Sequence, residues 1–592
     1  MKKASKLLAL VLALCLVLSM SALASGEASS GMPAPPPGGG GSSEPDSYDA
    51  VLEITSDQTL DGVAMESVNG DENIVHVMNG ATAWVKNSTF ENGGTGSGGD
   101  ASSFYGVGAT LFVSDGTLYA QDDVINTDTT GGAGVFAYKN GTAYASGLTI
   151  RTAQGSSGGL HVAGGGTLYA WDCDVETQAP MAAAAIRSDR GGGTMVIDGG
   201  RYVTSGGTGA VYVTADISVH DAYLYTGGSE AIAIEGKNTI RLFDCQLEGD
   251  MIPNSINDNK VWNIIVYQSM SGDADVGTSH YEMVGGQLTT HAGPIVYNTN
   301  TSSYITFKDV DIIRGDDTTY FLQVTGNASS RTWGRAGANG ANCIFSAYAQ
   351  QMPGDVVYDS ISNLDLYVLD GSVLDGAILY DDSLNGGYSG DGVMNLTIGE
   401  GSTWNVTGDS VITGTLACAG TVTGATILDL QGNVLWGDGP NKVYVGALTG
   451  TVDVSGAGEV PVWEDYAVEN PFGTSAASAD PSGEASNAPA ASNAPAASDE
   501  PAASGEPSGD ASAAPAAGGV SEDAYKEYLH QWLIAEDAVN DTMTEEIREN
   551  EFMPLIWAGD YTTFPAEMLW NGMLENGCPM TYDEFVAAGG VY

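Results

Sequence analysis

Acidic side chains crowd one stretch of the chain, where Gln121-Asp122-Asp123 is followed closely by Asn126-Thr127-Asp128. Hydrolysis of a glycosidic bond requires two carboxyl groups that face each other across that bond. The stretch supplies suitable residue types, but this chemistry also requires both motifs to point into one space. The elements that carry the two motifs therefore have to be identified first.

A sequence repeat identifies those elements. The segments TLYAQDDVINT, TAYASGLTIRT and TLYAWDCDVET begin at Thr117, Thr142 and Thr167, with 25 residues from each start to the next. A repeat of this period cannot bury its apolar face alone and must stack on its neighbours. Equivalent anchor residues continue the pattern at Thr82, Thr194, Asp216, Thr239, His280, Tyr304 and Asp365. The sequence therefore predicts an all-β solenoid over residues 48–465.

Alternation within each repeat predicts which side chains face the core. The positions one, three and eight after the anchor are mostly apolar, as in Leu118, Ala145 and Val175. The fifth position holds Asp or Gly, as in Asp122 and Gly147, and these residues tolerate a left-handed bend. Asp122 is therefore expected at a corner between two strands and not in a catalytic pair.

Oxygen-bearing side chains offer a second chemistry, the binding of Ca²⁺. Asp221 and Asp244 share the bend column in adjacent coils, where a spacing of about 5 Å would let them hold one cation. Asp381-x-Ser383-x-Asn385-Gly386 is similar to the start of a calcium loop, although Gly392 stands where a bidentate Glu is expected. Asp221, Asp244, Asp381 and Asn385 are thus candidate Ca²⁺ ligands, and solvated bends are the alternative.

Aromatic side chains form a third candidate site. The position two after the anchor, which alternation places outside, holds Trp84, Tyr119, Tyr144 and Tyr169, with Trp171 beside the last of them. Such a row could stack sugar rings along a polysaccharide. The alternative is a structural ladder, because stacked aromatic residues in neighbouring strands also stabilise one another.

Coils of 22 to 27 residues, Gly/Asp bends and inward aliphatic columns resemble the right-handed parallel β-helix of pectate-lyase-like proteins. The resemblance covers most of residues 50–465 and implies a polysaccharide-related role. In the polygalacturonase-type members the acidic motifs lie on different coils and are followed by GHG and RIK elements, which this chain lacks. A lyase would need an arginine base near a Ca²⁺ site, and neither Arg187/Arg190 nor Arg331/Arg335 has that context. No catalytic residue is assigned.

The flanking segments differ from the solenoid. Residues 1–24 carry basic residues, an apolar run and the small-residue site Ala22-Leu23-Ala24, as an export signal does. Composition rich in Pro, Gly, Ser and Ala predicts disordered tethers at 25–47 and 474–519, because such segments cannot bury a core. Apolar residues at helical spacing, together with capping boxes, predict a small α-helical module over 520–592 that could bind a protein partner.

Charge limits the possible partners. The chain has 19 basic and 74 acidic residues and a formal net charge of −55, which argues against nucleic acid and anionic membranes. No apolar run after the signal approaches the length of a transmembrane helix. We therefore expect a secreted or cell-surface, adhesin-like or glycan-binding protein without a transmembrane anchor. The alternatives are a polysaccharide lyase or glycoside hydrolase of the same fold, and a purely structural stalk.

Overall fold

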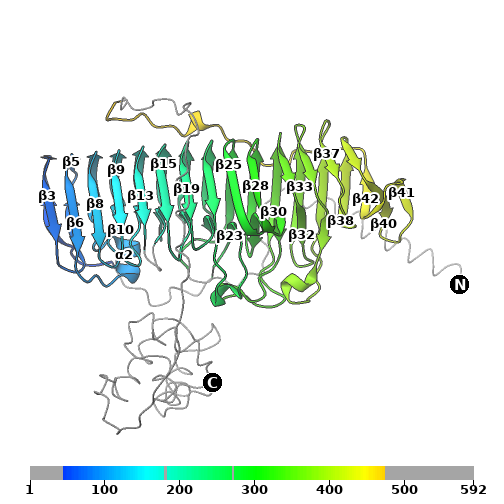
Figure 1. Ribbon diagram of the computed structural model, residues 1–592, viewed down its shortest axis with the longest axis horizontal. Coiled ribbons are helices and arrows are strands. Elements are labelled where there is room, and N and C mark those ends of the chain that lie inside the picture. Colours follow the sequence, from blue (N-terminus) through cyan, green and yellow to red (C-terminus); the bar gives the residue numbers. More distant parts are fainter. Residues whose placement is uncertain (1–43, 179–182, 270–271, 474–592) are drawn as a thin grey trace, which may run out of the picture. The chain divides into compact units, whose positions relative to one another are not determined.

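The computed structural model describes residues 44–178, 183–269 and 272–473 (Figure 1). These residues belong to one compact unit, Met1–Ala476. The predicted export signal, most of the first tether, the second tether and the predicted helical module lie outside the described residues. In the described part, no helix is long and apolar enough to cross a membrane.

The described residues form a solenoid of parallel strands, in which nearly every strand pairs with the equivalent strand of the next coil, and only the β40–β41 pair near its end is antiparallel. We call the strands that carry the anchor residues the anchor ladder. It consists of β5 (Ala81–Lys86), β7 (Leu111–Gln121), β9 (Val135–Ser146), β12 (Gly166–Trp171), β15 (Gly193–Asp198), β18 (Asp216–His220), β21 (Thr239–Phe243), β24 (Thr278–Val284), β27 (Ser302–Lys308), β30 (Asn342–Tyr348), β33 (Asn363–Leu369) and β36 (Met394–Ile398).

Two further ladders complete most coils. The second ladder consists of β4 (Glu72–Val77), β11 (Leu160–Ala163), β14 (Ile186–Ser188), β17 (Val211–Val213), β20 (Ile232–Glu235), β23 (Ile264–Tyr267), β26 (Val296–Thr299), β29 (Tyr320–Val324), β32 (Asp355–Tyr358), β35 (Ile378–Tyr380) and the first halves of β7 and β9. The third ladder consists of β3 (Ala64–Ser67), β6 (Thr89–Gly93), β8 (Val124–Asp128), β10 (Thr149–Thr152), β13 (Asp174–Thr177), β16 (Arg201–Thr204), β19 (Tyr223–Thr226), β22 (Gln246–Gly249), β25 (Gln287–Gly293) and β28 (Asp311–Thr318).

The remaining elements open, extend and close the solenoid. The first coil begins with β1 (Asp49–Ile54) and β2 (Gln58–Asp61), and a four-stranded sheet continues the third side with β31 (Gln351–Pro353), β34 (Val373–Asp375), β37 (Thr403–Asn405) and β39 (Thr421–Thr423). The last strands are β38 (Ser410–Cys418), β40 (Ala425–Asp429), β41 (Val434–Gly437) and β42 (Asn441–Thr449). The helices are α2 (Gly99–Tyr105) and the 3₁₀ turns η1 (Ser255–Asn257), η2 (Asp382–Asn385) and η3 (Trp463–Asp465).

Strand pairing confirms the predicted register. Thr117 pairs with Thr142, and Thr142 with Thr167, so the equivalent columns of side chains lie above one another. Thr239 pairs directly with His280, which shows that the long interval between them is a loop and not an extra coil. The predicted anchors omit Ile344, which occupies the anchor position between Tyr304 and Asp365, and Asn395, which pairs with Asp365 in the following coil.

The bend column also behaves as predicted. Asp122, Asp221 and Asp244 have φ angles of 53°, 47° and 51°, and Gly147 has a φ of 62°. A Cβ added to Gly147 would lie 2.6 Å from Oδ1 of Asp122, because the Asp side chain of one coil folds over the glycine of the next. The corner therefore combines a left-handed backbone with close packing between coils.

After β42 the chain turns back along the outside of the anchor ladder, as the yellow-to-orange segment in Figure 1 shows. We call residues 456–473 the strap. Gly458 bonds to Ser346, Trp463 stacks on His220, and Phe472 contacts Tyr119. The predicted solenoid range of 48–465 thus includes residues that lie on the surface of the stacked coils and not within them.

The corner yields a first prediction. We expect Gly147→Ala to cost about 1–2 kcal/mol, because the new Cβ combines an unfavourable φ with contact on Asp122. The midpoint of thermal unfolding should fall, and Asp122→Gly in the same chain should restore part of the loss, because it removes the contacted carboxylate and glycine tolerates the φ of 53° at this position. An unchanged midpoint for Gly147→Ala would contradict this account of the corner.

Candidate functional site

The predicted aromatic row exists, and its rings stack on one another. Centroid separations are 5.6 Å for Trp84–Tyr119, 4.8 Å for Tyr119–Tyr144 and 5.2 Å for Tyr144–Tyr169, with interplanar angles of 7°, 9° and 33°. The first two pairs are nearly parallel and overlap face to face, because coplanar rings at such distances would collide, and the third pair is tilted. Their faces are therefore covered by their neighbours. Trp84, which is 42% exposed, ends the row.

Trp171 does not lie on the open surface that the sequence predicted for this row. It is only 6% exposed, lies 6.5 Å from Tyr144 in a parallel orientation, and meets the edge of Phe472 at 6.5 Å. Phe472 also contacts Tyr119 at 6.1 Å. The strap covers this part of the row, which alternation alone could not reveal because it is remote in sequence.

The acidic motifs do not form a catalytic pair. Asp122 occupies the corner, and Asp123 is buried, where its Oδ1 accepts a hydrogen bond from the Ser88 amide at 2.8 Å. Burial raises the pKa of Asp123 to about 7, although its backbone hydrogen bonds oppose the shift. Asp128 lies at the far end of β8 and accepts a hydrogen bond from Gln154 at 2.6 Å. The carboxylates of the two motifs thus lie in different parts of one coil and do not face each other.

The candidate Ca²⁺ ligands have local roles. Asp221 and Asp244 are left-handed corner residues in neighbouring coils. Asp381 caps η2 by accepting a hydrogen bond from the Ser383 amide at 2.9 Å, and Asn385 bonds to both backbone groups of Tyr388. Within the described residues, no group of three or more His, Cys, Asp or Glu side chains is arranged to hold a metal ion. Calcium binding stays a prediction.

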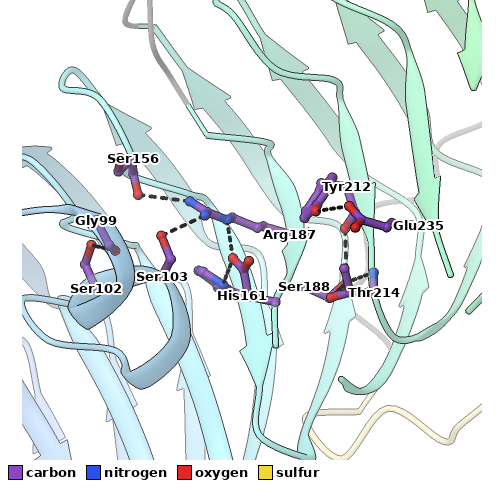
Figure 2. A network of polar contacts seen from close by, with 11 residues as sticks. Gly99, Ser102, Ser103, Ser156, His161, Arg187, Ser188, Tyr212, Thr214 and Glu235 are labelled. Carbon is purple, nitrogen blue, oxygen red and sulfur yellow. Dashed lines mark hydrogen bonds and ion pairs between the residues drawn. The ribbon is translucent and has the colours of Figure 1, made fainter. Parts of the chain in front are cut away.

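The arginine pairs considered for lyase chemistry are engaged in structural contacts. Arg187 donates to Asp189 at 2.6 Å and to Ser103 of α2 at 2.8 Å, which ties α2 to the second ladder (Figure 2). Arg190 pairs with Asp273 at 2.8 Å. Arg331 pairs at 2.6 Å with buried Glu230, and this guanidinium helps to hold the pKa of Glu230 below its usual value despite burial. Arg335 donates its backbone amide to Asn327 at 2.7 Å.

A pocket of about 360 Å³ opens on the third ladder, and sequence reasoning missed it. It is lined by Glu66, Ser67, Val68, Glu91, Asn92, Gly93, Asn126, Thr127, Asp128, Arg151, Thr152, Ala153 and Gln178. Register places Glu66, Glu91, Asn126 and Arg151 in one outward column, on four successive coils. The wall therefore presents carboxylates, an amide and a guanidinium at the spacing of the coils.

Mutual hydrogen bonds fix these groups. The Asn126 amide donates to Glu91 at 2.8 Å, and Arg151 donates to the Asp174 carbonyl at 2.8 Å while pairing with the Asp174 carboxylate. Partial burial would raise the pKa of Asp174, but hydrogen bonds from Arg151 and Arg201 outweigh burial and lower it. These contacts hold Glu91, Asn126 and Arg151 in place in the pocket wall.

Two tyrosines extend this polar face along the solenoid. Tyr223 and Tyr225 project from β19 on either side of inward Leu224, with ring centroids 6.4 Å apart and planes within 4°. The Tyr223 hydroxyl donates to Glu248 at 3.3 Å, and His291 lies 2.9 Å from the same carboxylate. The alternation in Tyr223-Leu224-Tyr225 was the sequence signal that could have identified this pair.

The buried network in Figure 2 is a different kind of cluster. His161 lies 3.0 Å from Asp189, and its ring centroid is 4.1 Å from that of Phe136. Burial lowers the pKa of His161 to about 4, although the hydrogen bond to the Asp189 carboxylate opposes this shift. Because His161 and Asp189 are both almost fully buried, the network stabilises the second ladder and does not face a ligand.

Comparisons of this chain with protein-family models, with curated proteins and with solved structures found no match. The geometry described above therefore carries the functional argument alone.

The His161 environment yields a pH prediction. A folded pKa of about 4, below the ordinary 6.5, means that the unfolded chain binds a proton more readily, so stability falls as pH falls from 6.5 to 4. By linkage the contribution is on the order of 3 kcal/mol at pH 4. His161→Gln should show a smaller fall in melting temperature over this range than the parent protein. Equal falls would contradict the assignment.

Proposed function

We propose that this protein is an exported, right-handed β-helix of the pectate-lyase-like kind that binds a glycan as an adhesin-like module. The observation that carries the proposal is the pocket on the third ladder, where Glu91, Asn126 and Arg151 are fixed by hydrogen bonds. Sugar hydroxyls both donate and accept hydrogen bonds, so a wall of carboxylate, amide and guanidinium groups suits them. The export signal and tethers expected from the sequence fit display outside the cell.

The coil repeat suits a polymeric ligand. Equivalent outward positions recur every 4.8 Å or so along the solenoid, and the polar face continues from the pocket through Arg201 to Tyr223 and Tyr225. The formal charge of −55 favours a neutral or cationic glycan over a polyuronate, because like charges repel. A glycan could also meet the free end of the aromatic row at Trp84, whereas Tyr119, Tyr144 and Tyr169 offer mainly ring edges.

Binding has more support than cleavage. The acids proposed for hydrolysis lie at a corner, in the core and at a strand end, and the guanidinium groups of Arg187, Arg190 and Arg331 are held in ion pairs. An arginine acting as a base would first have to leave such a pair, which is costly where the partner carboxylate is buried. Lyase or hydrolase activity is therefore the alternative that an experiment has to exclude.

A glycan array with detection of new reducing ends tests the proposal on the full mature chain. We expect one class of neutral or amino-sugar polymer to be retained without new chain ends. Glu91→Ala and Asn126→Ala should each weaken that binding roughly tenfold, since each removes a polar contact worth about 1.5 kcal/mol. The melting temperature should stay close to that of the parent protein, because both side chains lie on the surface.

Gln287→Ala is the matched control, since Gln287 lies on the same ladder, bonds to Asp311 at 3.1 Å and is remote from the pocket. It should leave glycan binding unchanged. If all three variants bind the glycan equally well, the binding site does not lie at the pocket. If no glycan on the array binds the protein, the structural stalk is favoured. Release of unsaturated or reducing ends would establish an enzyme instead.

A further inference from the structure

The strap lies along the outer side of the anchor ladder, a different face from the pocket, and we call the surface beneath it the groove. It starts near Tyr367, whose hydroxyl lies 2.6 Å from the place where a Cβ of Gly456 would be, and it ends at Phe472 beside Tyr119. These points are nine coils apart, or about 43 Å. Sixteen residue steps span at most roughly 53 Å, so the strap must be extended over most of its path.

The first attachment of the strap is a backbone contact. The amide of Gly458 donates to the Ser346 hydroxyl at 2.8 Å, and its carbonyl accepts from the Tyr348 hydroxyl at 2.6 Å. A Cβ at this position would lie 2.6 Å from Oγ1 of Thr306. The groove therefore requires a glycine here, which is a sequence-specific demand on whatever lies in it.

Aromatic side chains make the other attachments. Trp463 stacks on His220 at 4.7 Å and 9°, and it also contacts Phe243 at 5.6 Å. Tyr466 packs against Phe243 at 5.8 Å and lies beneath the guanidinium of Arg241 at 4.3 Å. Desolvated stacking and cation–π contacts of this kind contribute about 0.5–2 kcal/mol each.

Acidic residues of the anchor ladder hold the Arg241 guanidinium in place. Arg241 is ion-paired with Asp216 and lies 3.2 Å from Glu282, so its guanidinium is oriented before Tyr466 packs on it. Farther along, Phe472 makes T-shaped contacts with both Tyr119 and Trp171. The groove thus recognises glycine, tryptophan, tyrosine and phenylalanine at set positions, by contacts with residues of many different coils.

The strap is attached without being part of the core. None of its residues belongs to the buried core of the solenoid, and Val462 between two attachment points is 49% exposed. Between Thr449 and the strap, the hydrogen bonds of Thr451 and Ser455 are made to Thr449 and Asp453, within the segment itself. A change of direction in this connection would therefore leave both of these hydrogen bonds intact, and it would separate the Asp453 carboxylate from Tyr367, whose pKa that carboxylate helps burial to raise.

We propose that the groove is a peptide-recognition site that accepts residues 456–473 of a second copy of this chain in place of its own. The contacts at Gly458, Trp463, Tyr466 and Phe472 would be the same in both arrangements, and only the path of residues 450–455 would differ. Exchange of an identical element between copies costs little for this reason. The strap's own groove is at high effective concentration, so exchange becomes prominent as protein concentration rises.

A cross-linking experiment tests exchange directly. One tagged mature chain carries Phe472→Cys, and a second chain with another tag carries Tyr119→Cys, since these rings lie 6.1 Å apart. Both chains also carry Cys418→Ser and Cys578→Ser to remove competing thiols. After the chains are concentrated together and oxidised, we expect a disulfide that joins the two tags. Val462→Cys in place of Phe472→Cys is the control, because Val462 is 49% exposed and precedes Phe472 by ten residues in the strap.

A peptide experiment tests the groove itself. In the chain with Trp463→Ala, Tyr466→Ala and Phe472→Ala, a labelled peptide of residues 456–473 should bind at least tenfold more tightly than it binds the parent protein, whose groove is filled. The same peptide with its three aromatic residues replaced by alanine should not bind.

The proposal is overturned if the triple variant is folded at the assay temperature but fails to bind the peptide. It is also overturned if the cross-chain disulfide forms no more readily at position 472 than at position 462. Should the triple variant unfold, the cysteine pair still decides the question, because it leaves the other attachments of the strap intact.

Discussion

The whole architecture depends on one backbone feature, the left-handed bend five residues after each anchor. Asp122, Asp172, Asp221 and Asp244 adopt it, and glycines adopt it in the intervening coils. Because the bend recurs at a fixed place, each strand before it and each strand after it falls in register with the next coil. The apolar columns then line the interior, and the same alternation sends every second side chain outward.

That regularity explains how much of the fold could be predicted from the sequence. The repeat, the inward columns and the bend are local patterns, so they can be recognised in the sequence that begins with Thr117-Leu118-Tyr119 and in its copies. The coil at Ile344 was missed because its anchor is aliphatic and has lost the threonine signature. The strap was missed because its contacts join Phe472 to Tyr119, which no periodic pattern connects.

The candidate sites likewise differ in how far the sequence could predict them. The row from Trp84 to Tyr169 could be predicted, but its stacking could not, and a ring whose faces are covered by neighbours cannot also be an open platform. The pocket escaped prediction because it is made by unlike residues, Glu66, Glu91, Asn126 and Arg151, that share a column without sharing a type. Asp381 and Asn385 matched a ligand pattern locally, yet their nearest partners are backbone groups of their own turn.

Scarcity of positive charge connects these features. With 19 basic residues against 74 acidic ones, each arginine has several possible partners, and those at Arg151, Arg187, Arg201, Arg241 and Arg331 are all ion-paired. Such guanidinium groups are poor candidates for a base but good fixed donors, because their geometry is set before a ligand binds. Arg151 fulfils this role at the pocket and Arg241 fulfils it beneath the strap. The two faces thus share one feature, an ion-paired guanidinium that is held in place among aromatic or polar groups.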